Sequence, residues 1–500
     1  MMARLIPFLR NTLLALMLAG SAWAGAEDEP VAHALKLYEK HHYEEALRYL
    51  RPQLATLNAG SQAGARLALG MLCLRNAELY QALQGSANDI ALDYLKKLAA
   101  QKGRQSSVYV NYFLAQALLA EGKDADAIKY LQRFIAQPGV APGDKAQASV
   151  ALGTAYWHQH QASRAQATWS GVTGTQPEVR AALAAARAEA GQQTQQAAAA
   201  ADAVVAELKK QNKGINARSA RYLLRAYARL DMADKGLDVL AEQEFRGAAY
   251  VETLGQSKTL SFYDADLLGS MGQVYADAAT QALEQAARDS RLAAMSAYYL
   301  ADAYLLQGNA AQALRQSELF LAQPKLPAAY RDHARGVQAA AQYRAGKRQE
   351  AQAQWRDMAE QAASRPELLA ELLQSCVQAG ADCAAHAQRA ATVAESAEGK
   401  KFFALNAALG RYFLARKDYA KAVQYLEAGR DKANKNKIEI NDPVLLAGLA
   451  QVYYRSKQFS ESLEIYFEMS KQYPALRQMQ DALQGIYAVE QQSAGDVKIF

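Results

Sequence analysis

Apolar residues recur along this chain with the spacing of amphipathic helices, in which positions three and four apart share one face. Between residues 144 and 177, Leu152 and Tyr156 lie four apart, and Ala165 and Trp169 repeat that spacing after a polar stretch. No long run alternates apolar and polar residues with the period of a strand. The pattern therefore predicts an all-α chain of short helices joined by turns.

The helical pattern also repeats at a fixed offset of 186 residues. Residues 113–115 and 134–138 read FLA and FIAQP, whereas residues 299–301 and 320–324 read YLA and FLAQP. The match continues from Ala165 and Trp169 to Ala351 and Trp355. A fixed period that holds across helices and turns is typical of a repeat protein.

Each unit of the pattern is about 34 residues long. One unit places Leu152-Gly153 and Tyr156 on its first helix, Ala165 and Trp169 on its second, and Pro177 at its end. These residues resemble the tetratricopeptide repeat, and residues 409–426 and 449–474 resemble it too. The resemblance implies an α-solenoid of antiparallel helix pairs, a TPR-like superhelix, in which Gly153 allows close helix approach and Ala165 marks the helix crossing.

The repeat pattern suggests four segments along the chain. We expect a signal peptide at 1–24, an N-terminal array at 25–246, an insertion or hinge at 247–262, and a C-terminal array at 263–500. Residues 246–263 replace alanine with Thr, Val and Tyr, which favours a short hairpin between two arms. A second helix pair is expected at 61–102 with a lengthened turn at 78–87, and a capping helix at 476–489.

The first residues have the pattern of a secretory signal. Arg4 and Arg10 precede an apolar run at 13–19, and Ala22-Trp23-Ala24 forms a small-x-small cleavage site. The alternative, an uncleaved membrane anchor, needs about 20 apolar residues. We expect cleavage after Ala24 and a periplasmic location. The leader carries two arginines and no acidic residue, so cleavage lowers the net charge from +6 to +4, which does not favour nucleic acid.

Three cysteines, Cys73, Cys376 and Cys383, remain in an exported chain where disulfides can form. Cys376 ends one expected helix and Cys383 opens the next, with Asp382 as the expected N-cap. A disulfide here would resemble the stapled helix pairs of Sel1-like repeats, and two free core thiols are the alternative. His386 could make a third zinc ligand, but no fourth lies nearby, so we predict no metal.

The resemblance implies that the first helix of each pair lines a concave groove. The aromatic residues that this resemblance places on the groove face are Tyr109, Tyr112, Trp157, Tyr298, Tyr343 and Tyr454. Such a face could hold an extended peptide or stack on sugar rings. The alternative for each residue is ordinary packing between adjacent helices.

Four arginines share one face of a predicted helix because they are spaced by three, four and four residues. They are Arg218, Arg221, Arg225 and Arg229, here called the arginine row. Guanidinium groups in a row could bind carboxylates or phosphates, and a solvated basic face is the alternative.

Catalytic motifs are not found in the sequence. Residues 255–259 lack the glycines of a phosphate-binding loop, and the histidines at 41–42 and 158–160 fall at expected turns, where solvated side chains are the plainer interpretation. We therefore expect no enzyme activity and no cofactor. The hypothesis is a periplasmic scaffold or adaptor that binds a protein partner in cell-envelope assembly, such as a pilus, secretion or polysaccharide-export machine. The alternative is direct binding of an anionic polysaccharide or peptidoglycan-type glycan.

Overall fold

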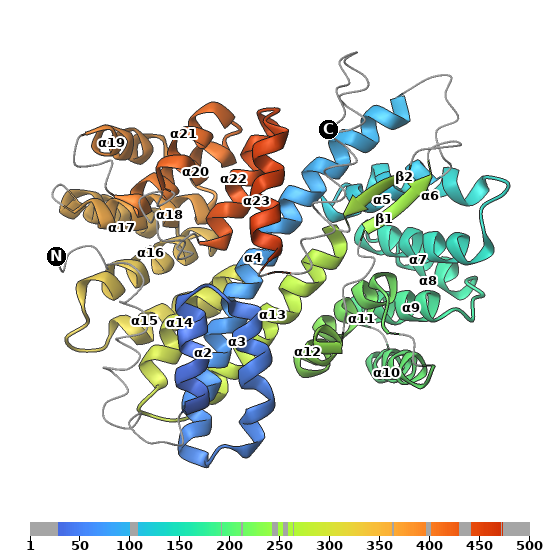
Figure 1. Cartoon of the computed structure of the whole chain (residues 1–500), viewed down its shortest axis with the longest axis horizontal. Coiled ribbons are helices and arrows are strands. Elements are labelled where there is room, and N and C mark those ends of the chain that lie inside the picture. Colours follow the sequence, from blue (N-terminus) through green and yellow to red (C-terminus); the bar gives the residue numbers. More distant parts are fainter. Residues whose placement is uncertain are drawn as a thin grey trace. The chain divides into compact units, whose positions relative to one another are not determined.

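The computed structural model confirms an all-α helical-repeat fold with one added β-hairpin (Figure 1). It describes residues 29–100, 109–191, 193–211, 214–242, 249–253, 259–263, 265–362, 365–396, 402–429, 442–471 and 473. The expected signal peptide and the expected capping helix at 476–489 lie outside these residues. No helix within them is long and apolar enough to cross a membrane.

The chain divides into two compact units. Unit 1 comprises Met1–Glu78 and Ala278–Ile465, and unit 2 comprises Leu79–Asp277 and Tyr466–Phe500. Two long helices, α4 (Ala59–Ala100) and α13 (Ala265–Ala286), contribute residues to both units.

Unit 1 contains the N-terminal helix pair and the later repeats. Besides its parts of α4 and α13, its elements are α2 (Glu29–Glu39), α3 (Tyr43–Leu50), the 3-10 helix η3 (Arg51–Thr56), α14 (Ala293–Leu306), α15 (Ala310–Leu321), α16 (Ala328–Arg344), α17 (Arg348–Gln361), α18 (Pro366–Ala379), α19 (Ala384–Glu395), α20 (Phe403–Ala415), α21 (Tyr419–Gly429), α22 (Pro443–Arg455) and the first part of α23 (Phe459–Ser470). The first helices α14, α16, α18, α20 and α22 each contact the next, and each pairs with the helix that follows it.

Unit 2 contains the earlier repeats and the hairpin. Its elements are α5 (Tyr109–Ala120), α6 (Asp124–Ala136), α7 (Pro142–His158), α8 (Ala162–Ser170), α9 (Pro177–Glu189), α10 (Thr194–Lys210), α11 (Ala217–Arg229), α12 (Ala233–Glu242), β1 (Ala249–Thr253) and β2 (Thr259–Tyr263), with its parts of α4 and α13. The strands are antiparallel, with Val251 opposite Ser261, so the expected hairpin is confirmed. Residues 247–262 fall in unit 2, and a hinge between two arms stays a prediction.

A three-residue turn recurs within the helix pairs. Its middle residue has a positive φ, as at Gly122, His160, Gly308 and Lys417. The next residue donates its N–H to the carbonyl five residues earlier, for example from Gln161 to Tyr156. This closure satisfies carbonyls at the helix end and fixes the direction of the second helix.

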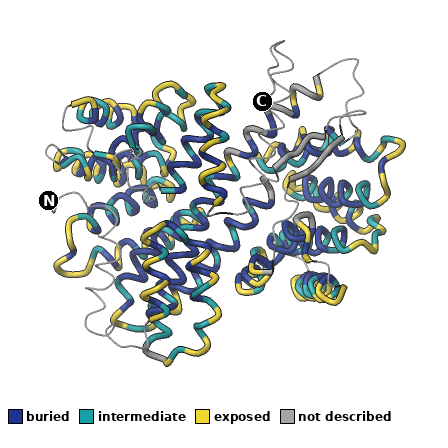
Figure 2. The backbone as a smooth tube through the Cα atoms, viewed as in Figure 1, coloured by how far each residue is buried: buried dark blue, intermediate teal, exposed yellow. Residues whose placement is uncertain are grey.

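The crossing between the two helices of a pair is made by a small residue with no exposed surface. Ala127, Ala165, Ala313 and Ala351 are all 0% exposed. The expected role of Ala165 is confirmed, and its echo at Ala351 has the same burial. Figure 2 shows buried residues along the packed helix faces and exposed residues at many of the turns.

The expected helix pair at 61–102 is wrong, because residues 59–100 form the single 42-residue helix α4. Residues 78–87 contain one glycine, Gly85, which costs a helix about 1 kcal/mol and does not end it. Packing on α13 supports the continuous helix. In unit 2 the ring of Tyr80 stacks on Tyr275 at 5.6 Å. In unit 1 a Cβ at Gly70 would lie 2.5 Å from Leu283.

Replacing Gly153 by alanine should lower the free energy of unfolding by about 1–3 kcal/mol, because it overpacks the crossing of α7 and α8. The new Cβ would lie 2.3 Å from the indole nitrogen of Trp169. That nitrogen donates to the carbonyl of Val150 at 3.1 Å, so the ring cannot move away freely. Urea unfolding monitored by tryptophan fluorescence measures the change.

The matched control is Gly85→Ala in α4, where a Cβ would meet nothing within 4 Å. This substitution should raise stability by about 1 kcal/mol through helix propensity alone. Equal effects of the two substitutions would contradict the packing account.

Candidate functional site

The structure places the arginine row on α11 in several different environments. The helix begins at an Asn216 cap, whose side chain accepts from the backbone N–H of Ser219 at 2.9 Å. Arg221 is 1% exposed, and its Nη2 donates to the hydroxyls of Tyr112 at 3.2 Å and Tyr222 at 2.7 Å. Two residues that the sequence singled out, Arg221 and Tyr112, are therefore in contact across α11 and α5.

The other arginines of the row are not equivalent to Arg221. Arg229 has a side chain that is 55% exposed, and its Nη2 lies 3.5 Å from Oε1 of Glu189. Arg225 is half-buried, and its charge acts on the same carboxylate. The side chain of Arg218 lies outside the described part of the chain. A uniformly solvated basic face is thus wrong at Arg221.

A histidine links the arginine row to the preceding repeats. His158 places Nδ1 at 2.9 Å from Oδ1 of Asp124 and Nε2 at 3.0 Å from Oε1 of Glu189. These bonds, with the Glu189 bond foremost and burial opposing, raise the pKa of His158 to about 9. Burial favours neutral Glu189, but His158, Arg225 and Arg229 lower its pKa to about 2. His158 is therefore a bridging cation, and the solvated-turn interpretation was wrong for it.

The echo of His158 performs the same bridging with different chemistry. Arg344, 186 residues later, ends α16 as His158 ends α7. Its Nη1 donates to the carbonyl of Leu305 in α14 at 2.9 Å, and its Nη2 donates to the carbonyl of Gln378 in α18. In both copies a cation at the end of a first helix ties its pair to the pairs before and after it.

Most of the predicted groove aromatics are packed against neighbouring rings. Tyr112 and Tyr298 are echo partners, and they lie 5.1 Å and 5.0 Å from Phe134 and Phe320. Both are buried, as is Tyr454. Ordinary packing therefore describes these three positions.

The remaining aromatics keep part of their surface exposed. Tyr109 donates its hydroxyl to Oδ2 of Asp144 at 2.7 Å. Trp157 and Tyr343, also echo partners, are half-buried against the tryptophans of their second helices. A ligand-binding role for Tyr109, Trp157 and Tyr343 stays a prediction.

Sequence reasoning missed a charged cluster in unit 1. His333 on α16 places Nε2 at 3.0 Å from Oδ2 of Asp302 on α14, and Nδ1 at 2.9 Å from Oε2 of Glu371 on α18. Burial disfavours the imidazolium, but the two carboxylates raise the pKa of His333 well above its usual value. Three successive first helices are joined by this one side chain.

The N-terminal helices of unit 1 bring further charges to this cluster. Arg75 on α4 places Nη1 at 2.6 Å from Oε2 of Glu78 and donates from Nε to the hydroxyl of Tyr38 at 3.2 Å. Burial raises the pKa of Glu78, Arg75 lowers it, and the nearby charges of Asp302 and Asp442 raise it further. The inner charges of α4 and of the later repeats therefore act on one another.

We call Glu78, Asp302, Glu371 and Asp442 the carboxylate site. Their side chains are 26%, 15%, 34% and 37% exposed, so solvent reaches all four. A comparison of the two echo copies contains the signal for part of it. Positions 116 and 147 are glutamines, whereas their echoes are Asp302 and His333. Two neutral amides in the first copy correspond to an ion pair in the second.

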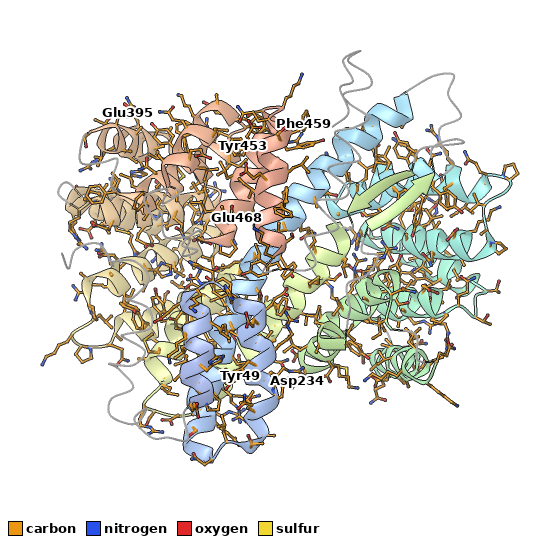
Figure 3. The ribbon with its side chains drawn as sticks, in the orientation of Figure 1. Tyr49, Asp234, Glu395, Tyr453, Phe459 and Glu468 are labelled. Carbon is orange, nitrogen blue, oxygen red and sulfur yellow. A yellow bond between two sulfur atoms is a disulfide. The ribbon has the colours of Figure 1, made fainter. Side chains whose placement is uncertain are left out.

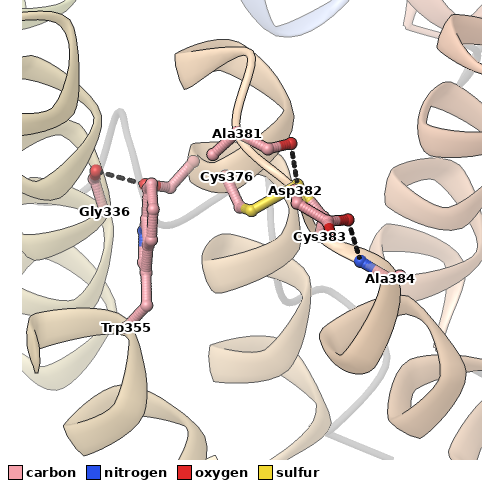
Figure 4. The surroundings of a disulfide bond; sticks show 8 residues. Gly336, Trp355, Cys376, Ala381, Asp382, Cys383 and Ala384 are labelled. Carbon is pink, nitrogen blue, oxygen red and sulfur yellow. Dashed lines mark hydrogen bonds between the residues drawn. A yellow bond between two sulfur atoms is a disulfide. The ribbon is translucent and has the colours of Figure 1, made fainter. Parts of the chain in front are cut away.

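A disulfide joins Cys376, near the end of α18, to Cys383, directly before α19, with Cα atoms 5.9 Å apart (Figure 4). Asp382 accepts from the backbone N–H of Ala384 at 3.1 Å, and Cys383 itself is the N-cap. Because the two sulfurs bond each other, they are not zinc ligands with His386. The third cysteine, Cys73, is buried, as expected from its position.

Replacing His158 by glutamine should remove a pH dependence of stability. A pKa raised from 6.5 to about 9 stabilises the fold below pH 6.5, and this stabilisation is lost as the pH rises to about 9. After allowance for solvent screening we expect a loss of about 1–2 kcal/mol over this range in the wild type. Urea unfolding at several pH values measures it.

The control is His160→Gln, at an exposed turn position in the same pair. This variant should keep the wild-type pH profile. A His158 variant with an unchanged profile would contradict the bridging role.

Replacing both Cys376 and Cys383 by serine should lower the free energy of unfolding by about 2 kcal/mol, as expected for a short closed loop. The bridge spans a sequence separation of only 7 residues. A thiol reductant should lower the wild-type unfolding midpoint to that of the double variant and leave the variant unchanged. A reductant effect of equal size on both proteins would contradict the bond.

Comparisons with known proteins give no family assignment by sequence, since no family model and no curated protein matches the chain. Among solved structures, yeast Tom70 is 11% identical, covers 97% of this chain and 96% of its own, and has a TM-score of 0.30. The TPR domain of P58(IPK) is 12% identical over 77% of this chain and 99% of its own, with a TM-score of 0.20.

The pentatricopeptide repeat protein PPR10, solved in complex with an 18-nt psaJ RNA element, is 15% identical, covers 96% of this chain and 67% of its own, and has a TM-score of 0.23. Scores this low support no argument about function. The repeat assignment rests on the helix pairs of the chain itself, which form an α-helical repeat that resembles the tetratricopeptide repeat.

Proposed function

We propose that this chain is an exported, non-catalytic scaffold that binds a protein partner in cell-envelope assembly, such as a pilus, secretion or polysaccharide-export machine. The signal-like leader supports export, and the stacked helix pairs support an extended binding surface. The observation that carries the proposal is the carboxylate site in unit 1.

The site suits an extended partner because its charges come from successive repeats. Asp302 and Glu371 lie on the first helices α14 and α18, and Asp442 precedes a third, α22. Neighbouring helix axes lie about 8–10 Å apart, and an extended chain advances about 3.3 Å per residue. A charged position on each first helix would thus meet about every third residue of an extended segment.

The glycan alternative loses its main support from the contacts of the arginine row. Arg221 is buried against two tyrosine hydroxyls, and Arg225 and Arg229 face the Glu189 carboxylate. Groups already paired within the protein must break those contacts to bind an anionic sugar, and breaking a buried pair is costly.

Photo-crosslinking in living cells tests the proposal. A photoreactive amino acid at Gln374, which accepts from Arg411 on α18, should capture a defined envelope protein identified by mass spectrometry. The matched control is the same substitution at Gln352, which is exposed on the second helix α17. Capture by neither position, or by both equally, would remove the support for a first-helix binding face.

A further inference from the structure

The buried hydroxyl of Tyr299 lies beside the carboxylate site. Tyr299 is 2% exposed and lies one helical turn before Asp302 on α14, so both share one helix face. Its hydroxyl has no hydrogen-bond partner among the described residues. Burial raises the pKa of Tyr299, and the charges of Tyr38, Tyr330 and Asp302 raise it while Arg75 lowers it. The hydroxyl is therefore directed toward the charges of the site.

The charges of the site are unbalanced. Its four carboxylates are matched by three cations, Arg75, His333 and Arg411. Arg411 contacts Asp442 only at 3.4 Å, longer than a good charged hydrogen bond. The carboxylates of Asp302 and Asp442 act unfavourably on Glu78. A further positive charge would relieve this repulsion.

Aromatic rings complete the surroundings of the site. The ring of Tyr298 lies 5.2 Å from both Tyr330 and His333. Carboxylates beside tyrosine rings suit an ammonium or guanidinium group, because ring faces also attract cations. An anionic ligand would meet the excess negative charge.

We propose that the carboxylate site, with the Tyr299 hydroxyl at its floor, binds a lysine or arginine side chain from an extended segment of the protein partner. This inference rests on the proposed scaffold function and names the chemistry that it recognises. The cation interacts with Glu78, Asp302 and Asp442, and the Tyr299 oxygen accepts a hydrogen bond from it. An unpartnered buried hydroxyl costs stability, so a ligand that pairs it gains by its presence.

Fluorescence anisotropy with the purified chain and a fluorescein-labelled Lys-Ser decapeptide, in which the two residues alternate, tests this inference. The peptide should bind, and its affinity should fall as salt is raised. The same peptide with acetylated lysines and a Glu-Ser decapeptide should bind at least 10-fold more weakly. Equal binding of all three peptides would overturn the inference.

The variant Tyr299→Phe separates binding from structure. It removes a hydroxyl that has no partner in the described fold, so the unfolding midpoint should stay the same or rise. Affinity for the Lys-Ser peptide should fall about 10-fold, the value of one hydrogen bond to a charged group. Unchanged affinity would overturn the role of the hydroxyl.

The matched control is Tyr425→Phe on α21, which removes a hydroxyl that donates to Glu395 at 3.0 Å (Figure 3 labels Glu395). This variant should lose stability and keep peptide affinity. Asp302→Asn should lose affinity at unchanged salt, and Tyr299→Phe covers the case in which that variant does not fold.

The two proposals fail in different ways. Capture of an envelope protein at Gln374 through a segment without lysine or arginine, together with no binding of the Lys-Ser peptide, would overturn this inference and leave the scaffold function standing. Failure of capture would overturn the scaffold function itself.

Discussion

The close crossing of the two helices in each pair is the constraint on which the rest of this fold depends. A side chain larger than alanine at Ala127, Ala165, Ala313 or Ala351 would hold the helices apart, and all four are completely buried. The three-residue turn with a left-handed middle residue delivers the second helix to that crossing. Because each pair is built the same way, the first helices of successive pairs come into contact and form one continuous face.

Contact between successive pairs lets one polar side chain join several repeats. His158 does so through two carboxylates, whereas its echo Arg344 does so through two backbone carbonyls. The position in the repeat is therefore retained while its chemistry changes. His333 shows the same principle at another position, where it joins three first helices of unit 1.

Function follows from where such charges remain reachable. The arginine row is partly spent on internal contacts, with Arg221 buried and Arg229 beside Glu189. The carboxylate site keeps exposed edges and an excess of negative charge, and it includes residues from the N-terminal helices as well as from the later repeats. Its composition favours recognition of a positive side chain over an anionic sugar.

The sequence by itself determined the helical repeat, because helix propensity, small crossing residues and turn residues are local signals that recur at a readable period. The pairs around Gly153 and Gly410 and the hairpin at 249–263 follow from such signals. Only the tertiary structure decided that α4 is one helix, since its support comes from α13, about 200 residues away. It also decided that Arg221 meets Tyr112 and that Glu78 lies near Asp302, because burial and charge pairing depend on neighbours that no local pattern specifies.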